Sequence, residues 1–197
     1  KVMPGDTVMV HHTTITPCQK EYLLAFHKPA GIVCTTSKID KNNVIDYLNF
    51  PERIYPVGRL DKESTGLLLL TNNGQLMDDV LRGSNYHEKE YIVHVNKPIT
   101  DSVLQAMAQG VPILDTITRP CKIRRMGKDC FYITLTQGLN RQIRRMCEYF
   151  DYRVTSLKRI RIMNIELGSL PVGKWRELTP SEIKTLKNLA QNKGEAE

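Results

Sequence analysis

The chain has 197 residues, of which 41% are hydrophobic, enough for one domain or two closely joined subdomains with a real core. The 28 Lys and Arg residues exceed the 21 Asp and Glu residues by seven, so we expect a globular protein with a basic face and an anionic partner. No apolar run approaches the roughly 20 residues that span a bilayer, and the first residues show no secretory pattern. These features exclude a membrane-spanning protein and a polybasic tail.

The five cysteines have no C-x-x-C spacing, which favours a reduced, cytoplasmic protein over a disulfide framework. His11 and His12 are adjacent, so on a strand they would face opposite ways and make a poor pair of metal ligands. We therefore expect no metal site.

The first half of the chain shows short strand patterns separated by turn residues. Apolar residues at helical spacing follow Asn43, and the run "GLLLLT" is typical of a strand buried on both faces. In chain order we expect a turn at Pro4-Gly5-Asp6, a strand over 7–10, two strand-like runs within 22–35 on either side of a turn at 28–31, a helix over 42–50, extended chain over 53–61, a strand over 66–71 and a helix that starts at 75 and stops at Gly83.

The second half continues with more strands than helices. In chain order we expect a strand over 88–97, a helix over 99–110, strands over 121–126 and 130–138, a helix over 140–150, two strands within 153–170, a capped helix over 179–190 and a frayed end. The final helix carries a capping box, with Thr179 at its start and Glu182 three residues later. Strands and helices do not alternate regularly, which favours an α+β fold with a largely antiparallel sheet.

The predicted helix "NRQIRRMCEYF" has an apolar stripe and a basic stripe. Between residues 141 and 161 seven basic residues stand against Glu148 and Asp151: Arg141, Arg144, Arg145, Arg153, Lys158, Arg159 and Arg161. Two interpretations remain open from the pattern alone, a solvated helix face or a surface that binds phosphates. The basic balance of the whole chain favours nucleic acid.

Asp61 follows Arg59 in "VGRLDKESTG", just before the buried strand. An aspartate in such a loop is usually a turn former, whereas a catalytic aspartate would need a cationic partner to stay ionised in a partly dry cleft. Tyr91 has the same ambiguity, since a strand tyrosine is most often a packing residue but can also stack on a nucleobase.

Taken together, "GRLDKESTGLLLLTNNG", "HEKEYIVHV" and "QGLNRQIRRMCEYF" resemble the RsuA-type pseudouridine synthases, over about residues 22–178. The segment that begins "LNRQIRRMCEYF" is most similar to the RluF-like branch. The resemblance implies a pseudouridine synthase fold, which is α+β, with a mixed, mostly antiparallel sheet, flanking helices and a central RNA-binding cleft. It also implies that residues 18–197 form a catalytic domain of two subdomains that divide near residue 85. Residues 1–17 would be the remnant of an amino-terminal RNA-binding domain and its linker.

The resemblance also assigns roles to single residues. Asp61 matches the catalytic aspartate, Tyr91 the tyrosine that stacks on uracil, and Arg144 the cation paired with the aspartate. Arg59 resembles the arginine that enters the RNA stack when the target base leaves it, and Ile162 supplies an apolar contact in the uracil pocket. We expect RNA-binding roles for Arg59, Arg141, Arg145, Arg153, Lys158 and Arg161.

The implied activity is isomerisation of a uridine in ribosomal RNA to pseudouridine, with the large subunit as the main substrate and tRNA as a second one. Such a reaction oxidises nothing and transfers no group, so it needs no cofactor or metal. We also expect the protein to be a monomer. One alternative is a non-enzymatic RNA-binding or ribosome-assembly protein with the same fold. Another is a hydrolase of N-glycosides, which would require a second carboxylate in the cleft. Asp46, Asp78 and Asp79 lie on predicted helices, at positions expected to face solvent.

Overall fold

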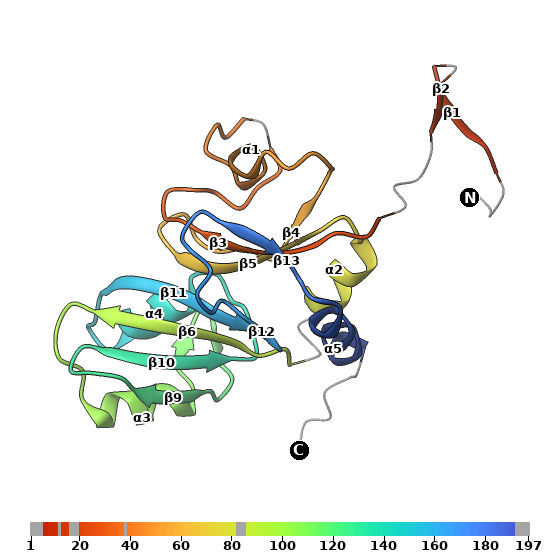
Figure 1. Cartoon of the computed structure of the whole chain (residues 1–197). Coiled ribbons are helices and arrows are strands. Elements are labelled where there is room, and N and C mark those ends of the chain that lie inside the picture. The colour runs from red at the N-terminus through yellow and green to blue at the C-terminus, as the bar shows by residue number, and fades with distance from the viewer. Residues whose placement is uncertain (1–5, 12, 16–19, 38, 82–85, 192–197) are drawn as a thin grey trace.

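The protein is built around one long, mixed β-sheet (Figure 1). The computed structural model describes residues 6–11, 13–15, 20–37, 39–81 and 86–191. The main sheet has the strand order β13-β3-β5-β11-β6-β10-β9, with β4 beside β5 and β12 beside β11. Its strands are β3 (Leu23–Lys28), β4 (Tyr55–Val57), β5 (Thr65–Thr71), β6 (Lys89–Val95), β9 (Lys122–Arg125), β10 (Cys130–Leu135), β11 (Val154–Ile162), β12 (Ile165–Glu166) and β13 (Trp175–Glu177).

Five helices and two small hairpins complete the described structure. The helices are α1 (Val44–Leu48), α2 (Gly74–Leu81), α3 (Asp101–Gln109), α4 (Gln142–Tyr149) and α5 (Pro180–Gln191). The hairpins pair β1 (Val8–Val10) with β2 (Thr13–Ile15) and β7 (Pro112–Ile113) with β8 (Thr116–Ile117). The main sheet is antiparallel except where β5 and β11 run parallel, so the predicted α+β class with a mostly antiparallel sheet is confirmed.

The half of the sheet formed by β3, β4 and β5 is covered on both faces. One face packs against α1 through a cluster that includes Phe26, Val44 and Leu68, and the other packs against α2 and α5 through Leu67 and Leu186. Because successive strand residues point to opposite faces, double coverage explains why the whole leucine run is buried.

The chain returns to this first half at its end. In Figure 1 the blue β13 and α5 lie beside the orange and yellow elements, and β13 pairs with β3. The capping box predicted at the start of α5 is confirmed, because the Thr179 amide donates to Glu182 Oε2 at 2.8 Å and the Glu182 amide donates to Thr179 Oγ1 at 3.3 Å. Near residue 85, where a domain division was predicted, the chain passes from the first half of the sheet to the second. After β11 it passes back, because β13 and α5 belong to the first half again.

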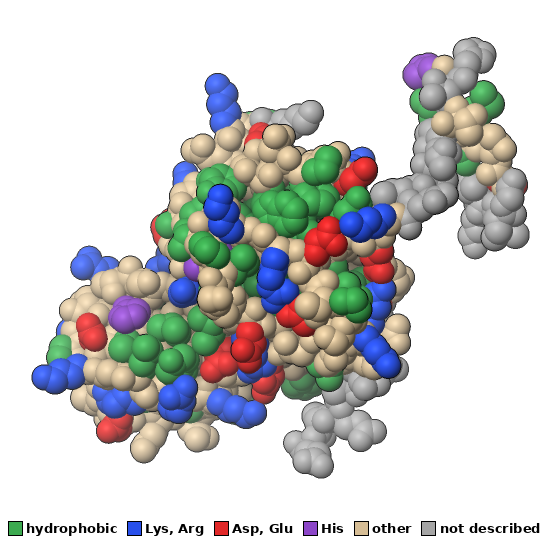
Figure 2. All heavy atoms as spheres, in the orientation of Figure 1, with side chains coloured by type: hydrophobic (Ala, Val, Ile, Leu, Met, Phe, Trp, Pro, Cys, Tyr) green, Lys and Arg blue, Asp and Glu red, His purple; other side chains and the backbone are tan. Residues whose placement is uncertain are grey.

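The other half, β11, β6, β10 and β9, is covered on one face only. Helices α3 and α4 pack against that face through residues such as Val93, Phe131 and Met146. Figure 1 shows these strands in front of the two helices, with the opposite sheet face toward the viewer. The same view in space-filling form shows apolar and basic side chains mixed across that face (Figure 2).

Some local predictions were wrong. The second run within 22–35 is not a strand, since Val33 makes only an isolated bridge to Asn43. Neither the β7–β8 hairpin nor β13 was predicted, because each is very short and lacks a strand pattern of its own. The expected turn at Pro4 and Gly5, the helix stop at Gly83 and most of the final frayed segment lie outside the described residues. Within the described part of the chain, no helix is both long enough and apolar enough to cross a membrane.

The two halves meet at the parallel pair of β5 and β11, where Gly66 lies opposite Arg159. Gly66 has a φ of +107°, and a Cβ added to it would lie 2.1 Å from the Arg159 carbonyl oxygen. Any side chain at this position would therefore collide with backbone atoms that cannot move without separating the strands.

We expect Gly66→Ala to lower the free energy of unfolding by about 3 kcal/mol or more, because it adds both backbone strain and a backbone clash. Gly74→Ala is the matched control, since Gly74 begins α2 with nothing within 4 Å of an added Cβ. Urea denaturation of both variants measures the effect. Equal stability of the two variants would contradict the proposed constraint.

Candidate active site

A cleft of about 530 Å³ opens above the joint between β5, β11 and β6. Its borders are the loop at 57–64, the end of α2 at 80–81 and the segment 135–143 that leads into α4. Strands β6 and β11 supply its floor. The sequence motifs that were separated along the chain thus meet at one place.

Asp61 lies in the loop between β4 and β5, with its side chain 30% exposed to the cleft. Its Oδ2 is 3.5 Å from Arg144 Nε and 3.9 Å from Arg141 Nη1. The Arg144 side chain is only 11% exposed, against 41% for Arg141, and Arg141 Nη1 also lies 3.5 Å from Glu63. Arg144 is therefore the closer and less exposed partner of Asp61, and solvent screens its ion pair less than that of Arg141.

The Asp61 loop is held from below by a buried lysine. Lys28 has no exposed surface, and its ammonium donates to the carbonyls of Pro29 at 2.8 Å, Lys62 at 3.3 Å and Ser64 at 2.9 Å. Arg144 Nη2 donates to Ser64 Oγ at 3.2 Å. Burial lowers the pKa of Lys28, but the three carbonyls satisfy its donors. The aspartate is thus carried on a loop with fixed backbone.

Tyr91 projects from β6 into the cleft floor, between two hydrophobic clusters that both contact it. On the neighbouring strands it lies opposite Ile133 and Arg159. Ile162, which is 2% exposed, also lines the cleft. The floor therefore presents an aromatic ring and aliphatic surface, with the carboxylate of Asp61 at the rim.

Four basic side chains line the same cleft. Arg59 and Arg141 are exposed at its rim, whereas Lys89 and Arg159 lie deeper. Arg159 Nε donates to the Leu67 carbonyl at 2.7 Å and Nη1 donates to the Arg59 carbonyl at 3.3 Å, while its Nη2 has no hydrogen-bond partner among the described residues. The first turn of α4 adds the partial positive charge of a helix start.

Among the residues that line the cleft, Lys89 has the pKa that departs furthest from its ordinary value. Burial, reinforced by repulsion from Arg159, lowers its pKa to about 8. Its ammonium is 3.4 Å from the His87 carbonyl, and among the described residues no carboxylate pairs with it. His87 lines the same wall, with Nδ1 at 2.9 Å from the Val80 carbonyl and a buried Nε2 that has no hydrogen-bond partner among the described residues.

The other basic residues singled out in the sequence lie outside the cleft lining. Arg145 donates to Asn140 at the start of its own helix, and Arg153 is exposed beyond the opposite end of β6. Lys158 neighbours Arg159 on β11 and so points to the opposite face. Arg161 is paired with Glu88 at 2.9 Å and Glu90 at 3.0 Å, so the structure places it in a surface ion-pair network.

Sequence analysis missed Lys89, His87 and Arg159 as cleft residues. Lys89 and His87 stand in the quoted motif "HEKEYIVHV", and Arg159 stands in "KRIRIM". Their motif positions were a usable signal, but their burial depends on contacts between β6, β11 and α2. Within the described residues, no group of three or more potential metal ligands lies in this cleft.

Comparison with known proteins supports one interpretation of the cleft. Residues 22–149 match the RNA pseudouridylate synthase family model. The chain is 50% identical over 194 residues to the dual-specificity RNA pseudouridine synthase RluF of Escherichia coli K12, covering 98% of this chain and 67% of that protein. It is 33% identical to ribosomal large subunit pseudouridine synthase B of Bacillus subtilis, covering 98% of this chain and 82% of that one.

A solved pseudouridylate synthase structure superimposes with a TM-score of 0.79 at 28% identity, covering 94% of this chain and 82% of the other. The similarity thus extends across the cleft and both halves of the sheet. The predicted resemblance is confirmed, and an enzyme is favoured over a non-enzymatic RNA-binding protein. The chain belongs to the RNA pseudouridylate synthase family and is an isomerase of the RsuA type, similar to the RluF branch.

Proposed function

We propose that this cleft converts a specific uridine of ribosomal RNA to pseudouridine, with tRNA as a second substrate. The observation that carries the proposal is the Asp61 carboxylate, paired with Arg144 at the rim of a cleft whose floor is Tyr91. The relatives' names support ribosomal RNA as a substrate through "ribosomal large subunit" and more than one kind of target through "dual-specificity RNA".

The bond changes define what the site must do. The N1–C1′ bond of uridine breaks, the detached uracil turns, and a C5–C1′ bond forms. The proton on C5 leaves, and N1 gains a proton, so the product is an isomer of the substrate. No oxidant, reductant or transferred group enters the balance. The side chains therefore need to supply a carboxylate, a binding platform for uracil and proton transfer.

Asp61 is the group we assign to the sugar. Its ionised carboxylate either adds to C1′ or removes a sugar proton to give a glycal, and both routes require the charged form. The nearest cation is the Arg144 guanidinium, which is largely shielded from solvent and lies 3.5 Å away. Ser64 orients Arg144 through the 3.2 Å hydrogen bond to its Nη2.

Tyr91 and Ile162 are the residues we assign to the base. A uracil above the Tyr91 ring would keep its face covered while it turns, and the aliphatic side chain of Ile162 would exclude water beside it. The Tyr91 hydroxyl is then a candidate for proton transfer at C5.

Arg59 and Arg141 are the residues we assign to the RNA strand. A base must leave its stack before the cleft can admit it, which costs a few kcal/mol. The exposed Arg59 side chain at the rim can fill the space left behind, since guanidinium planes stack on bases. Arg141 can bind a phosphate next to the target, and Arg145, Arg153 and Lys158 lie on adjoining or opposite surfaces where longer RNA could reach.

Asp61→Asn is expected to slow pseudouridine formation by roughly 10²- to 10⁴-fold or more, because the amide can neither add to C1′ nor accept a sugar proton. Tritium release from 5-tritiated uridine in an unmodified large-subunit rRNA transcript measures the rate, and a filter-binding assay measures RNA affinity. Asp78→Asn, at an exposed aspartate on α2, is the control. Wild-type protein that binds RNA without tritium release, or a fully active Asp61→Asn, would contradict the proposal.

We also propose that Lys89 is kept without a carboxylate partner so that its ammonium can bind RNA phosphate. In the free protein its pKa of about 8 lies below the ordinary lysine value of 10.5, so the charged form is disfavoured by folding. The unfolded chain therefore binds more protons than the folded chain between pH 8 and 10.5. Over that interval this group makes the protein more stable as pH rises.

Lys89→Met is accordingly expected to raise the free energy of unfolding by roughly 1–3 kcal/mol at pH 7, with a gain that shrinks toward pH 10. It should also weaken RNA binding and reduce its salt dependence, since one phosphate contact is lost. Urea denaturation at several pH values and RNA titrations at several salt concentrations measure both effects. Lys184→Met, at an exposed lysine on α5, is the control. An unchanged or lower stability at pH 7, or unchanged RNA binding, would refute the assignment.

A further inference from the structure

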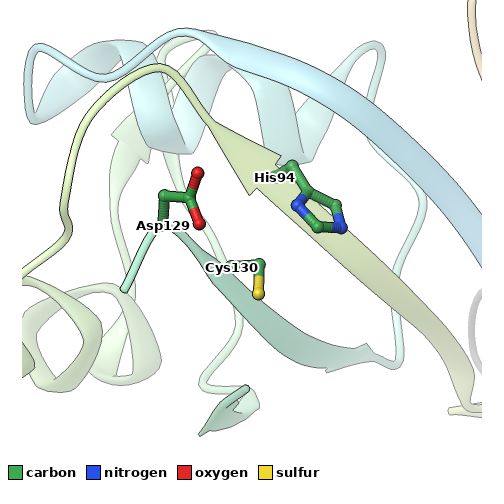
Figure 3. Close-up of side chains that lie close together, drawn as sticks. All are labelled: His94, Asp129 and Cys130. Atoms are coloured by element: carbon green, nitrogen blue, oxygen red, sulfur yellow. The ribbon is translucent and has the colours of Figure 1, made fainter. Parts of the chain in front are cut away.

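A second cluster of chemically active side chains lies on the sheet face away from α3 and α4. It consists of His94 at the end of β6, Cys130 at the start of β10 and Asp129 just before it (Figure 3). One nitrogen, one sulfur and one carboxylate oxygen from these residues all lie within 4.8 Å of one another. The cluster belongs to neither the cleft nor its rim.

Strand register brings the three residues together. His94 and Cys130 are directly opposite each other on antiparallel strands, so their side chains share one sheet face. Asp129 is fixed beside them, because its carbonyl accepts a hydrogen bond from the Val95 amide at 2.9 Å. Some 35 residues separate His94 from the other two, so no short sequence motif predicts the cluster.

The Cys130 sulfur is largely enclosed, with the backbone of Gly127 close beside it. Cys130 is 8% exposed, and a Cβ added at Gly127 would lie 2.9 Å from its Sγ. His94 is half-buried and Asp129 is exposed, so solvent reaches the cluster from the Asp129 side. Among the residues that the structure describes, none forms a hydrogen bond or ion pair with these three side-chain groups. All three ligand atoms are therefore available.

We propose that His94, Asp129 and Cys130 bind one Zn²⁺ ion, with a water molecule in the fourth position. Thiolate, imidazole and carboxylate are zinc ligands at distances of about 2.0–2.3 Å, and a tetrahedral arrangement places such atoms roughly 3–4 Å apart. The atoms, which lie within 4.8 Å of one another, would have to approach by up to about 1 Å when the ion binds. The sulfur and nitrogen ligands select zinc over magnesium or calcium, which prefer oxygen.

The consequence of binding would be a link between β6 and β10 on the face opposite the active site. Tyr91 is three residues before His94 on β6 and points to the other face. Zinc would therefore stabilise the strand that carries the cleft platform without entering the cleft. Zinc binding can be measured without RNA and without pseudouridine formation. A negative result would therefore contradict the zinc site alone and not the proposed function.

The test uses reduced protein freed of metal by a chelator and titrated with Zn²⁺ in a calorimeter and with Co²⁺ in a spectrophotometer. We expect one equivalent to bind, a thiolate-to-cobalt charge-transfer band and visible bands of tetrahedral intensity, together with a higher melting temperature in zinc. Cys130→Ser should abolish the charge-transfer band, and His94→Ala should weaken binding at least about tenfold.

Asp129→Asn provides a variant whose exposed position does not challenge folding, and it too should weaken zinc binding about tenfold or more. Cys121→Ser is the control, because this half-buried thiol lies outside the cluster and should leave the affinity unchanged. Failure of the folded wild-type protein to bind either ion overturns the proposal. So does binding that survives all three cluster substitutions, or binding that is lost in Cys121→Ser.

Discussion

The close approach of β5 and β11 at Gly66 and Arg159 is the constraint on which the cleft depends. It joins the doubly covered half of the sheet to the singly covered half, and it does so through a parallel pair that leaves no room for a side chain at Gly66. The Arg159 guanidinium then extends from this joint to the carbonyls of Leu67 and Arg59. The loop that carries Asp61 is thereby tied to the strand that lies beside Tyr91.

The basic side chains of the site lie at different depths around this joint. Lys28 is fully buried and its ammonium donates only to carbonyls, so it fixes the loop without pairing with the aspartate. Arg144 is slightly more exposed and lies 3.5 Å from the Asp61 carboxylate. Arg59 and Arg141 are exposed at the rim and Lys89 lies deeper in the same cleft, where we propose that RNA phosphate binds. Lys89 has no carboxylate partner among the described residues, so its charge costs stability in the free protein, and we propose that RNA binding offsets this cost.

The sequence predicted those parts of the molecule whose cause is local. The buried leucine run and the capping box at Thr179 and Glu182 depend on nearby residues, and both were found correctly. Strand β13 and the loss of the expected strand near Val33 depend on pairing partners far along the chain. The same limit applies to sites. Motifs singled out Asp61, Tyr91 and Arg144, which the structure places close together, but neither the burial of Lys89 nor the ion pairs of Arg161 can be inferred from spacing.

We propose that Arg159 is a positioning residue that holds the Asp61 loop at the joint, because its Nη1 donates to the Arg59 carbonyl in that loop. The most direct test of this role is the single-turnover rate of tritium release by Arg159→Met, a change that keeps side-chain bulk but removes the hydrogen bonds to Leu67 on β5 and to Arg59 in the loop. We expect the rate at saturating RNA to fall about 10²-fold, as a misplacement near 1 Å would cause, while the protein remains folded and the Kd for RNA changes less than about tenfold. An unchanged rate, or a loss explained entirely by weaker RNA binding, would contradict this positioning role of Arg159.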